Sequence, residues 1–421
     1  MPTTPRPALL LALLTVGCAS TADSAPGTVE DDAVTWYRDV RPVVDETCVR
    51  CHMDGGIASS FADPAVAQSL APMMKAYVEA GVMPPPAPDP DCQDYDSSGT
   101  FFLSDEGRAT IIAWADAGAP LGDAADAPAP VTPTTLAPFD LELHGSSPYT
   151  PDFGGGPNDY RCFRLDLEND GPVYLTGLEP LVDNPRIVHH VVLFDVPANA
   201  GASQVDDPTA GFACSGFGEN GWDFVSGWAP GGGPVALPEG MGIKLGRDAH
   251  LVLQMHYYAS GPDAYGLTDQ SGYGLKLADQ VDKQVYVYPL GSFEFTIAAG
   301  DADAHVDMIL PWAEDYPAID ILGVFPHMHQ LGSGFDMYVA HPDASQDCLV
   351  HMDDWSFHNQ ITALYTEPAR VSPGDVLSLT CRWDNSAENP NQTSQPPVDV
   401  GFGEGSQDEM CFGFTYGVLA D

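Results

Sequence analysis

Residues 323–332 read Gly-Val-Phe-Pro-His-Met-His-Gln-Leu-Gly, and the rest of the chain can be interpreted outward from this stretch. Its apolar residues and closing glycine predict a β-strand. Side chains two positions apart in a strand leave the same face, so His327 and His329 are expected to point the same way. Imidazole is a common transition-metal ligand, and two imidazoles on one rigid element can chelate one ion. Two ordinary polar residues on a solvated face would give the same pattern, so the rest of the chain has to decide.

Similar short apolar or alternating runs recur through residues 138–421, separated by turns rich in glycine and proline, which number 42 and 39 in the chain. Helical periodicity is scarce there, and the pattern is typical of antiparallel β-sandwiches. Strands are expected at residues 160–167, 187–196, 242–245, 250–258, 285–288, 304–310, 319–325, 335–339, 376–382 and 411–418. Because this part exceeds one sandwich, we predict two, at residues 138–288 and 289–421.

The chain has 421 residues, which is too many for one typical core and indicates two to four domains. It carries 15 basic and 60 acidic residues, a formal net charge of −45. Such a charge repels phosphates and argues against nucleic acid or an anionic membrane surface as a partner. A solvated acidic surface on an exported protein accounts for this charge, although it would also favour cation uptake.

Residues 1–18 have the pattern of a secretory signal peptide. A basic residue precedes an apolar run at residues 8–16, which is too short to span a bilayer. Small residues around Cys18 are typical of a bacterial lipoprotein site, where that cysteine carries the lipid anchor. We therefore expect an exported bacterial lipoprotein, periplasmic or anchored at the outer membrane or cell surface, with a flexible tether at residues 19–33.

The next motif is Cys48-Val-Arg-Cys51-His52, the attachment pattern of c-type haem. Two thiols at this spacing reach the two vinyl groups, and the adjacent imidazole falls on the iron. A redox dithiol or half of a zinc site would use the same cysteines. The sequence has no second Cys-x-x-Cys to complete a zinc site and no thioredoxin-like βαβ pattern around the motif. It therefore favours one covalently bound haem.

Residues 34–125 around this motif resemble a small class I cytochrome c domain. A closing helix is expected to begin after Ser104 as N-cap and to stop at Gly118. The apolar face of that helix would consist of Ile111, Ile112 and Trp114. Met83, in a proline-held loop before the helix, is the predicted sixth iron ligand. The proline-rich residues 126–137 are expected to form a semi-rigid linker.

Two further histidine features and one methionine fall on predicted strands. His189 and His190 are adjacent, so they point to opposite faces and can share one metal only if the backbone bulges or twists there. His256 ends an apolar strand, and Met410 stands at the polar lip of another. Taken singly, ordinary core or surface residues explain each feature as well. The remaining histidines lack matching partners and are expected to be structural: His144, His250, His305, His341, His351 and His358.

Together these residues resemble the copper type II, ascorbate-dependent monooxygenases, the family of the peptidylglycine α-hydroxylating and dopamine β-monooxygenases. The resemblance extends over most of residues 138–421. Its motifs follow in the family's order: His189-His190, Trp228-Ala229-Pro230, Leu237-Pro238-Glu239-Gly240, Leu253-Gln254-Met255-His256-Tyr257, His327-x-His329 and Glu409-Met410-Cys411. The resemblance implies two jelly-roll-like sandwiches, each with one copper ion, facing across a solvent-filled cleft.

The resemblance also implies the ligands of two copper ions. The copper that transfers electrons would be held by His189, His190 and His256. The copper at which oxygen is activated would be held by the catalytic set His327, His329 and Met410. The ligand chemistry agrees with these roles, because a thioether favours Cu(I) whereas imidazole suits both oxidation states.

Nine cysteines in an exported chain indicate disulfides or cofactors rather than free thiols. The resemblance implies two bridges, Cys162–Cys214 and Cys381–Cys411. The second bridge would pin Met410 in place. Cys92 and Cys348 receive no assignment.

Two positions depart from the peptide-hydroxylating branch of the family. That branch has an arginine for the substrate carboxylate two positions before the His-x-His pair, where this chain has Phe325. It has a tyrosine four residues after the methionine ligand, where this chain has Phe414. Both changes make the pocket more apolar and argue against a peptide carboxylate, so we expect an apolar or aromatic C–H donor.

The sequence thus predicts a mainly β copper monooxygenase that inserts one atom of O2 into an sp3 C–H bond of a small substrate. Two electrons per turnover would come from ascorbate or a redox protein outside the chain, with the fused haem as a relay. The alternative is an exported copper-binding or electron-transfer protein without oxygenase activity. Copper-storage proteins cluster their ligands at short spacing, whereas this chain spreads single ligands over two domains.

Overall fold

The computed structural model describes residues 33–96, 102–130, 134–196, 207–214, 221–403 and 405–421. The predicted signal peptide and nearly all of the tether lie outside the described residues, as does part of the linker. Residues Val34–Asp421 form one compact unit. Within the described part of the chain, no helix is long and apolar enough to cross a membrane.

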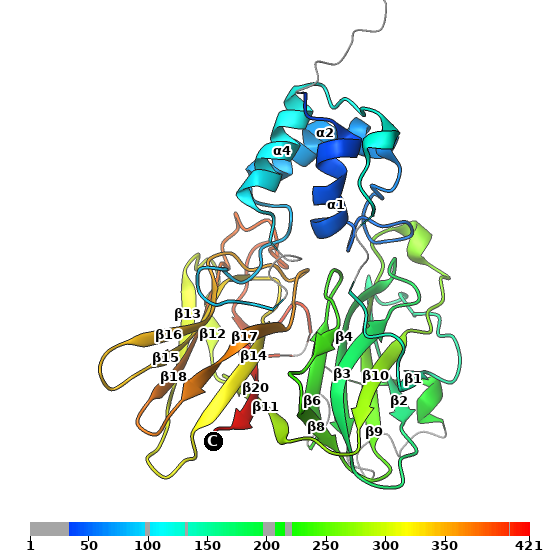
Figure 1. The fold of residues 1–421 in the computed structure, drawn as a ribbon. Helices are drawn as coiled ribbons and strands as arrows, with labels where there is room; N and C mark the ends of the chain where they lie inside the picture. Colours follow the sequence, from blue (N-terminus) through cyan, green and yellow to red (C-terminus); the bar gives the residue numbers. More distant parts are fainter. Residues whose placement is uncertain (1–32, 97–101, 131–133, 197–206, 215–220, 404) are drawn as a thin grey trace, which may run out of the picture. The chain divides into compact units, whose positions relative to one another are not determined.

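A small helical region precedes the strands. It contains the π-helix η1 (Trp36–Val40), α1 (Arg41–Thr47), α2 (Pro64–Glu79) and α4 (Asp105–Asp116) (Figure 1). The prediction of α4 is confirmed: the Ser104 side chain accepts a hydrogen bond from Gly107 N at 3.1 Å. Ile111 and Trp114 are buried on its inner face, and Trp114 packs on Trp36 with ring centroids 5.3 Å apart. The helical region therefore has its own apolar core.

Between α2 and α4, the chain leaves the helical region and follows the C-terminal strands. We call residues 85–96 the strap. Its Asp89 N–H donates to His351 O at 2.8 Å, and its Asp96 N–H donates to Leu364 O at 2.9 Å. Cys92 forms a disulfide with Cys348. The aspartates of this loop therefore belong to a segment that is bound to the second half of the β-structure.

The first group of strands contains a five-stranded sheet in the order β5-β2-β9-β4-β6. Its strands are β2 (Asn158–Asp166), β4 (Val188–Val196), β5 (Phe212–Ala213), β6 (Asp223–Trp228) and β9 (His250–Tyr258). The Cys162–Cys214 disulfide, one of the pairs that the resemblance implied, joins β2 to the residue after β5. The buried face of this sheet contributes to the largest apolar core of the molecule.

A nine-stranded sheet runs through both halves of the β-structure, in the order β1-β10-β3-β8-β11-β20-β14-β17, with β7 beside β3. Its strands are β1 (Leu141–His144), β3 (Val173–Leu181), β7 (Val235–Ala236), β8 (Met241–Leu245), β10 (Gly272–Ala278), β11 (Lys283–Gly291), β14 (Ile319–His327), β17 (Ala363–Val371) and β20 (Phe412–Leu419). The expected boundary at residues 288 and 289 falls inside β11. That strand pairs with β8 of the first half and with β20 of the second.

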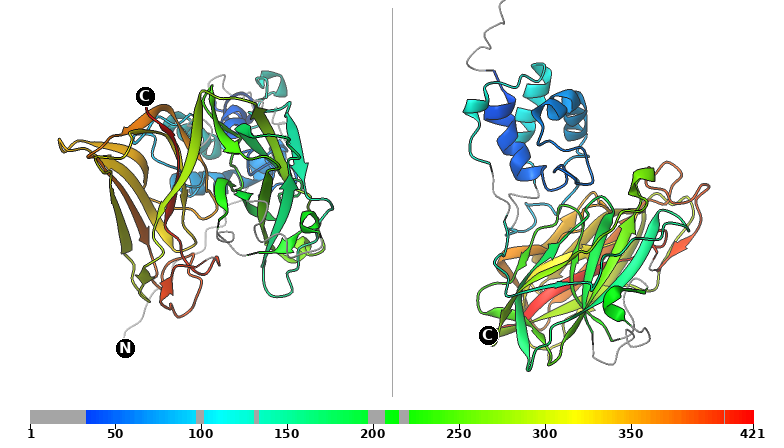
Figure 2. Two further views of the ribbon diagram at one scale, coloured as in Figure 1. Left: turned by 90° about the horizontal axis from the view of Figure 1, so that it is seen from below. Right: turned by 90° about the vertical axis from the view of Figure 1, so that its right-hand side faces the viewer.

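The second group of strands is completed by a four-stranded sheet, β13-β18-β15-β16, and a two-stranded sheet, β12-β19. These strands are β12 (Thr296–Ile297), β13 (Ala304–Pro311), β15 (Gly332–Ala340), β16 (Gln346–Met352), β18 (Val376–Trp383) and β19 (Val400–Gly401). Figure 2 shows this group in yellow to red and the first group in green. The prediction of a mainly β chain is confirmed, whereas the likeness of the helical region to a cytochrome c stays a prediction.

Candidate metal centres

A β-bulge brings the two adjacent histidines of β4 to one place. The register between β4 and β9 shifts between Val188, which pairs with Tyr257, and His190, which pairs with His256. His189 is the extra residue at this shift. Because the bulge removes the strict alternation of faces, His189 and His190 both turn toward His256. The sequence required such a bulge for a shared metal, and the structure contains one.

The ring nitrogens of these three histidines face one another. His190 Nδ1 lies 3.1 Å from His189 Nδ1 and 3.2 Å from His256 Nδ1. Nitrogen ligands about 2 Å from one tetrahedral metal ion lie about 3.3 Å apart, so the spacing fits a single ion. All three side chains group as a potential metal site with ligand atoms within 4.8 Å of one another.

The outer nitrogens of two of these rings have partners that hold them in place. His256 Nε2 lies 2.7 Å from Asn158 Oδ1, which requires the proton on Nε2 and leaves the Nδ1 lone pair toward the other two rings. His189 Nε2 lies 3.1 Å from His358 Nδ1. Tyr160 stacks on the His256 ring with centroids 4.3 Å apart. Such contacts fix both tautomer and ring orientation, as expected around metal ligands.

The second histidine pair begins at the end of β14. We expected His327 and His329 on one strand, but β14 ends at His327, and His329 lies in the turn that follows. The two rings are almost perpendicular, with centroids 5.2 Å apart. His327 Nδ1 lies 2.5 Å from Gln360 Oε1, and His329 Nδ1 lies 3.0 Å from Asp408 O. Both oxygens accept a proton from Nδ1, which puts the lone pair of each ring on Nε2.

Met410 lies just before β20, which neighbours β14 in the sheet. The last register pair between these strands is His327 with Phe412, two residues after Met410. Met410 is 2% exposed and lines the same cleft as both histidines. The Cys381–Cys411 disulfide, the other pair that the resemblance implied, ties the residue after Met410 to β18.

The turn that carries His329 is shaped by Glu409, a fully buried carboxylate. Its two oxygens accept hydrogen bonds from His329 N at 2.9 Å and Leu331 N at 2.6 Å. The same carboxylate accepts from the indole of Trp383 at 2.9 Å. The N–H groups of His329 and Leu331 therefore donate to this carboxylate and not to a neighbouring strand. This explains why the strand does not continue beyond His327.

Burial keeps the five imidazoles neutral. Desolvation, and in second place the neighbouring rings, lowers the pKa of His189 and of His327 to about 3. The pKa of His329 falls to about 4 through burial. Burial and the adjacent rings put the pKa of His190 and of His256 well below the usual value. Neutral imidazole is the form that binds a metal, so the protonation states suit both centres at neutral pH.

One cleft contains residues of both centres. Its empty volume is about 490 Å³, part of which opens to solvent. His190 of the first set and His327, His329 and Met410 of the second line it. The Phe357 ring lies between them, with its centroid 5.1 Å from that of His189 and 5.9 Å from that of His329.

The remaining cleft wall is mainly aromatic. Phe224 stacks on Phe414 with centroids 3.9 Å apart and lies 5.5 Å from Phe325. Phe325 also packs against Gly227, where its ring leaves no room for a Cβ atom. Phe325 and Phe414 are register partners on β14 and β20. Both residues that depart from the peptide-hydroxylating branch are therefore in the cleft wall.

The haem-attachment motif forms one turn after α1. His52 N donates to Cys48 O at 3.0 Å, and neither Cys48 nor Cys51 is in a disulfide. Burial raises the pKa of Cys48 to about 12 and raises that of Cys51. Haem attachment therefore stays a prediction, with a redox dithiol as its alternative.

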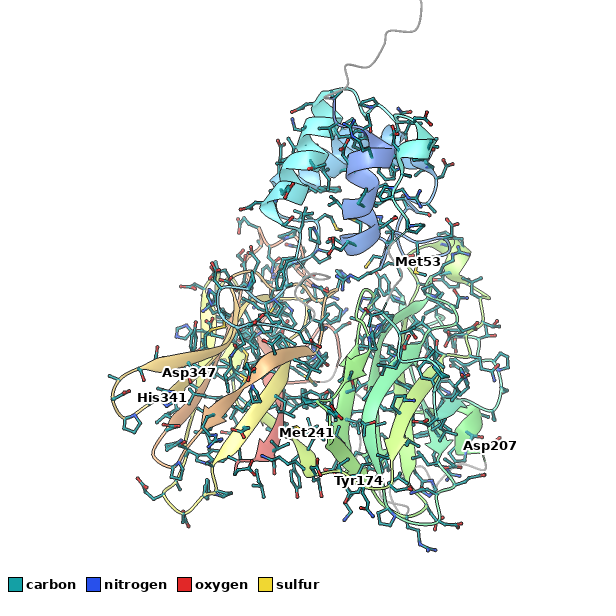
Figure 3. All side chains as sticks on the ribbon, viewed as in Figure 1. Met53, Tyr174, Asp207, Met241, His341 and Asp347 are labelled. Atoms are coloured by element: carbon teal, nitrogen blue, oxygen red, sulfur yellow. A yellow bond between two sulfur atoms is a disulfide. The ribbon has the colours of Figure 1, made fainter. Side chains whose placement is uncertain are left out.

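The histidine of this motif is oriented as an axial ligand requires. His52 Nδ1 lies 2.8 Å from Ser59 O, so Nδ1 carries the proton and the lone pair is on Nε2. The ring stacks on Phe61 with centroids 4.1 Å apart. Large apolar side chains are exposed around the motif and α2: Met53 (labelled in Figure 3), Ile57, Met73, Tyr77 and Val82. This apolar surface and the donor set fit a covalently held haem.

Met83 follows α2 in a turn in which its N–H donates to Tyr77 O at 3.2 Å. Only Pro84 separates it from the strap, and its side chain is half-buried. Its role as sixth iron ligand stays a prediction.

Three of the histidines expected to be structural pair with aspartates, and one of them is His250, whose Nδ1 lies 2.6 Å from Asp166 Oδ1. His341 Nε2 lies 3.1 Å from Asp347 Oδ2, and both residues are labelled in Figure 3. His351 Nδ1 lies 2.5 Å from Asp336 Oδ1. His358 is exposed, as expected of a surface residue, but it contacts His189.

Sequence reasoning missed four residues that support the centres: Asn158, His358, Gln360 and Glu409. Their partners come from other strands or loops, so no spacing rule could reveal them. Glu409 alone carried a signal, since an acidic residue directly before a methionine ligand and a disulfide cysteine is an unusual core residue.

Two sets of neutral imidazoles, one of them with a thioether nearby, define a class of protein built to hold two soft or borderline metal ions in one cleft. The sequence profiles of the copper type II ascorbate-dependent monooxygenases match this chain twice. The N-terminal domain profile matches residues 156–262, and the C-terminal domain profile matches residues 287–416. Together they cover more than half of the chain, and the chain belongs to this family.

Curated relatives agree with this assignment. A DBH-like monooxygenase protein 1 from Gallus gallus is 24% identical over 286 residues, which cover 61% of this chain and 44% of the relative. A peptidyl-glycine alpha-amidating monooxygenase A from Xenopus laevis is 26% identical over 287 residues, covering 63% of this chain and 28% of the relative. The chain thus spans less than half the length of these proteins. Among solved structures, an infectious bursal disease virus VP2 particle aligns at 9% identity over 69% of this chain and 74% of its own, with a TM-score of only 0.19.

Proposed function

We propose that this protein is a copper-dependent monooxygenase that hydroxylates an sp3 C–H bond of a small apolar substrate. The observation that carries the proposal is the convergence of two separate ligand sets on one cleft of about 490 Å³. The overall reaction consumes the substrate, O2, two electrons and two protons, and it yields the hydroxylated product and water. Copper bound at the two centres would supply oxygen activation and one-electron transfer.

The residues of the chain take distinct parts in this proposal. His327 and His329 present Nε2 lone pairs, fixed by Gln360 and by Asp408 O, and Met410 adds a thioether that favours the reduced metal. The three Nδ1 atoms of His189, His190 and His256 form the second site. We keep in this proposal the prediction that residues 138–288 and residues 289–421 form two domains, each with one copper site.

The aromatic wall supports an apolar substrate. Phe224, Phe325 and Phe414 line the cleft, and none of the described lining residues is a lysine or arginine. A substrate carboxylate would lose its hydration there without gaining a cationic partner, which costs several kcal/mol (about 2–7 for polar groups). An alkyl or aryl C–H donor loses nothing comparable.

We further propose that a c-type haem on Cys48, Cys51 and His52 relays single electrons to the three-histidine centre. An acidic surface repels an anionic reductant such as ascorbate, and a covalently attached relay would replace or supplement it. The external donor would then be ascorbate or a redox protein. Export, a lipid on Cys18 and a bacterial cell-envelope location belong to the same proposal, and they draw support from the three disulfides.

The copper count and an isotope experiment test the monooxygenase together. The copper-loaded protein is expected to hold two copper ions per chain and to incorporate one atom of 18O2 into apolar amines, alcohols or aromatics. The alternative, a copper-binding or electron-transfer protein, predicts redox-active copper with no label in any product. A count of one or of many copper ions, or unlabelled products throughout such a screen, would reject the proposal.

A further inference from the structure

Four consecutive residues in the loop between β16 and β17 contact both proposed ligand sets and the start of the strap. We call Phe357–Gln360 the coupling segment. Phe357 lies between the two ligand sets, and His358 meets His189. Gln360 bonds His327. Asn359, at the centre of the segment, reaches the start of the strap.

Asn359 connects the coupling segment to the helical region. Its side chain is 4% exposed, and its Nδ2 donates to Pro86 O at 2.8 Å and to Pro85 O at 3.3 Å. These prolines lie two and three positions after Met83. A buried Asn side chain without hydrogen-bond partners would cost about 1–3 kcal/mol. The two proline carbonyls supply these partners and so stabilise the contact between the loop and Asn359.

His358 connects the coupling segment to the three-histidine centre. Its Nδ1 lies 3.1 Å from His189 Nε2, the ring atom opposite the Nδ1 that faces His190. The two rings are nearly perpendicular, with centroids 5.3 Å apart. His358 contacts the outer nitrogen of His189 in the same way as Asn158 contacts the outer nitrogen of His256. The difference is that His358 comes from the other half of the β-structure.

We propose that the coupling segment is where an electron crosses from the haem region to the three-histidine centre. The route runs from the Met83–Pro86 loop through the Asn359 amide and one peptide unit to His358, and then to His189. This inference rests on the haem relay proposed above. One electron moves per event: ferrous haem becomes ferric, Cu(II) becomes Cu(I), and no bond is made or broken. Ascorbate or a redox protein restores the ferrous haem.

A second contact offers a rival crossing. The Arg50 guanidinium, between the two haem cysteines, donates to Gly231 O. Gly231 also lies against Cys51, since a Cβ atom there would be 3.2 Å from the Cys51 sulfur. That loop follows Trp228, which pairs with Val191 on β4, next to His190. The experiment therefore needs a variant at each crossing.

The test uses the full chain carrying haem and two copper ions, with substitutions that remove one contact each. Asn359→Leu removes the amide that holds the prolines, and His358→Phe removes the imidazole next to His189. Arg50→Gln addresses the rival crossing. His305→Phe is the matched control, because His305 is an exposed histidine on β13. Copper analysis and the haem absorption spectrum verify that each variant is folded and loaded.

The main readout is the rate of haem reoxidation under argon after a pulse of a one-electron photoreductant. We expect at least a tenfold slower rate in Asn359→Leu and His358→Phe, and an unchanged rate in His305→Phe. The EPR hyperfine splitting of Cu(II) at the three-histidine centre should shift in His358→Phe but not in Asn359→Leu. A merely structural role of His358 would not change that signature in a folded protein.

The possible outcomes distinguish a failure of the coupling segment as the electron route from a failure of the haem relay itself. If haem in the unaltered protein is never reoxidised by the copper centres, the relay itself is wrong. If the unaltered protein transfers electrons and both coupling-segment variants match it, the relay stands and the coupling segment is not the crossing. A slow rate only in Arg50→Gln would assign the crossing to the Gly231 loop and would also overturn the inference. The expected pattern of slow and unchanged rates supports it.

Discussion

At the scale of single residues, the sequence predicted the metal ligands but not the residues that orient them. His189, His190 and His256 were visible because they interrupt apolar strands. The partners of their outer nitrogens were not visible, because Asn158 and His358 become neighbours only when distant strands pair. Residue type alone therefore predicts a metal centre, whereas its ring orientations depend on tertiary structure.

Met410 is expected to matter for one centre only. Met410→Ile keeps the volume and apolarity of this buried side chain but removes the thioether, the ligand that favours Cu(I). We expect hydroxylation to fall at least 100-fold and the copper count to fall from two to about one. Metal analysis with EPR of the remaining Cu(II) checks this expectation. Turnover at the unaltered rate would remove Met410 from the site.

Glu409 is expected to determine the stability of the turn that carries His329. Glu409→Gln keeps the shape of the side chain but replaces one acceptor oxygen of the carboxylate by an NH2 group. That NH2 group would face a backbone N–H donor, which then has no acceptor. Burial raises the pKa of Glu409 to about 7, so its side chain is mainly charged at pH 8. Hydrogen bonds to charged groups are worth about 1.5–3 kcal/mol each, so at pH 8 we expect the unfolding free energy to fall by about 3 kcal/mol. Urea titration measures this change.

The matched control is Glu388→Gln, because Glu388 is exposed. Its unfolding free energy should stay within about 0.5 kcal/mol of the unaltered value. An equal loss in both variants, or no loss in either, would show that Glu409 has no special role.

At the scale of elements, alternating and apolar runs predicted ten strands, and each of them is present. Two long strands that sequence reasoning missed carry residues that disfavour strands. β3 contains Gly177 and Pro180, and β17 contains Pro368. In these strands sheet neighbours outweigh local propensity. In β14, tertiary contacts shorten a strand instead of extending one. The sequence predicted that the strand reaches His329, but the hydrogen bond of His329 N to the Glu409 carboxylate ends it at His327.

The pairing of β4 with β6 predicts a pH effect far from the metal centres. Asp195 pairs with Asp223, and burial followed by that second carboxylate raises the pKa of Asp195 to about 6. Its ordinary value is 3.8. Between those values the native state binds more protons than the unfolded state, so stability falls as pH rises from about 4 to 6 and stays lower above that range.

Asp195→Asn removes that penalty. At pH 8 we expect the variant to be more stable than the unaltered protein by up to about 3 kcal/mol, the value of two pKa units. At pH 3.5 the two should differ by less than about 0.5 kcal/mol, because Asp195 is then protonated in the native state and mostly protonated in the unfolded state. Thermal unfolding across pH 3.5–8 (roughly the range that brackets both pKa values) measures the difference. The exposed Asp315→Asn should show no such trend, and a pH-independent gain in Asp195→Asn would contradict this explanation.

At the scale of the whole molecule, the strap was the least predictable feature. Cys92 and Cys348 are 256 positions apart, and no pairing rule connected them. Two backbone hydrogen bonds, from Thr366 N to Asp94 O and from Asp96 N to Leu364 O, depend on tertiary structure alone. The same holds for the nine-stranded sheet, in which β11 joins two halves that the sequence presented as separate sandwiches.

The disulfide of the strap is expected to hold the helical region in working contact with the copper-binding strands. Replacing Cys92 and Cys348 by serine removes the one covalent tie and leaves backbone hydrogen bonds, the side-chain hydrogen bonds of Asn359, Gln93 and Thr366, and the contacts of buried Tyr95. Freed of a covalent tie, a surface segment opens at low energetic cost. We expect the amides of Asp89 and Asp96 to lose at least tenfold of their protection in hydrogen exchange.

The same variant should separate the two electron sources. Haem reoxidation is expected to slow at least fivefold, because the prolines bonded by Asn359 lie on the released strap, whereas turnover with excess ascorbate should change less than twofold. Replacing Cys162 and Cys214 by serine is the control, since that bridge joins β2 to the residue after β5 and should leave strap exchange unaltered. Full protection of the strap without Cys92–Cys348 would mean that its hydrogen bonds and the Tyr95 side chain suffice to hold the helical region.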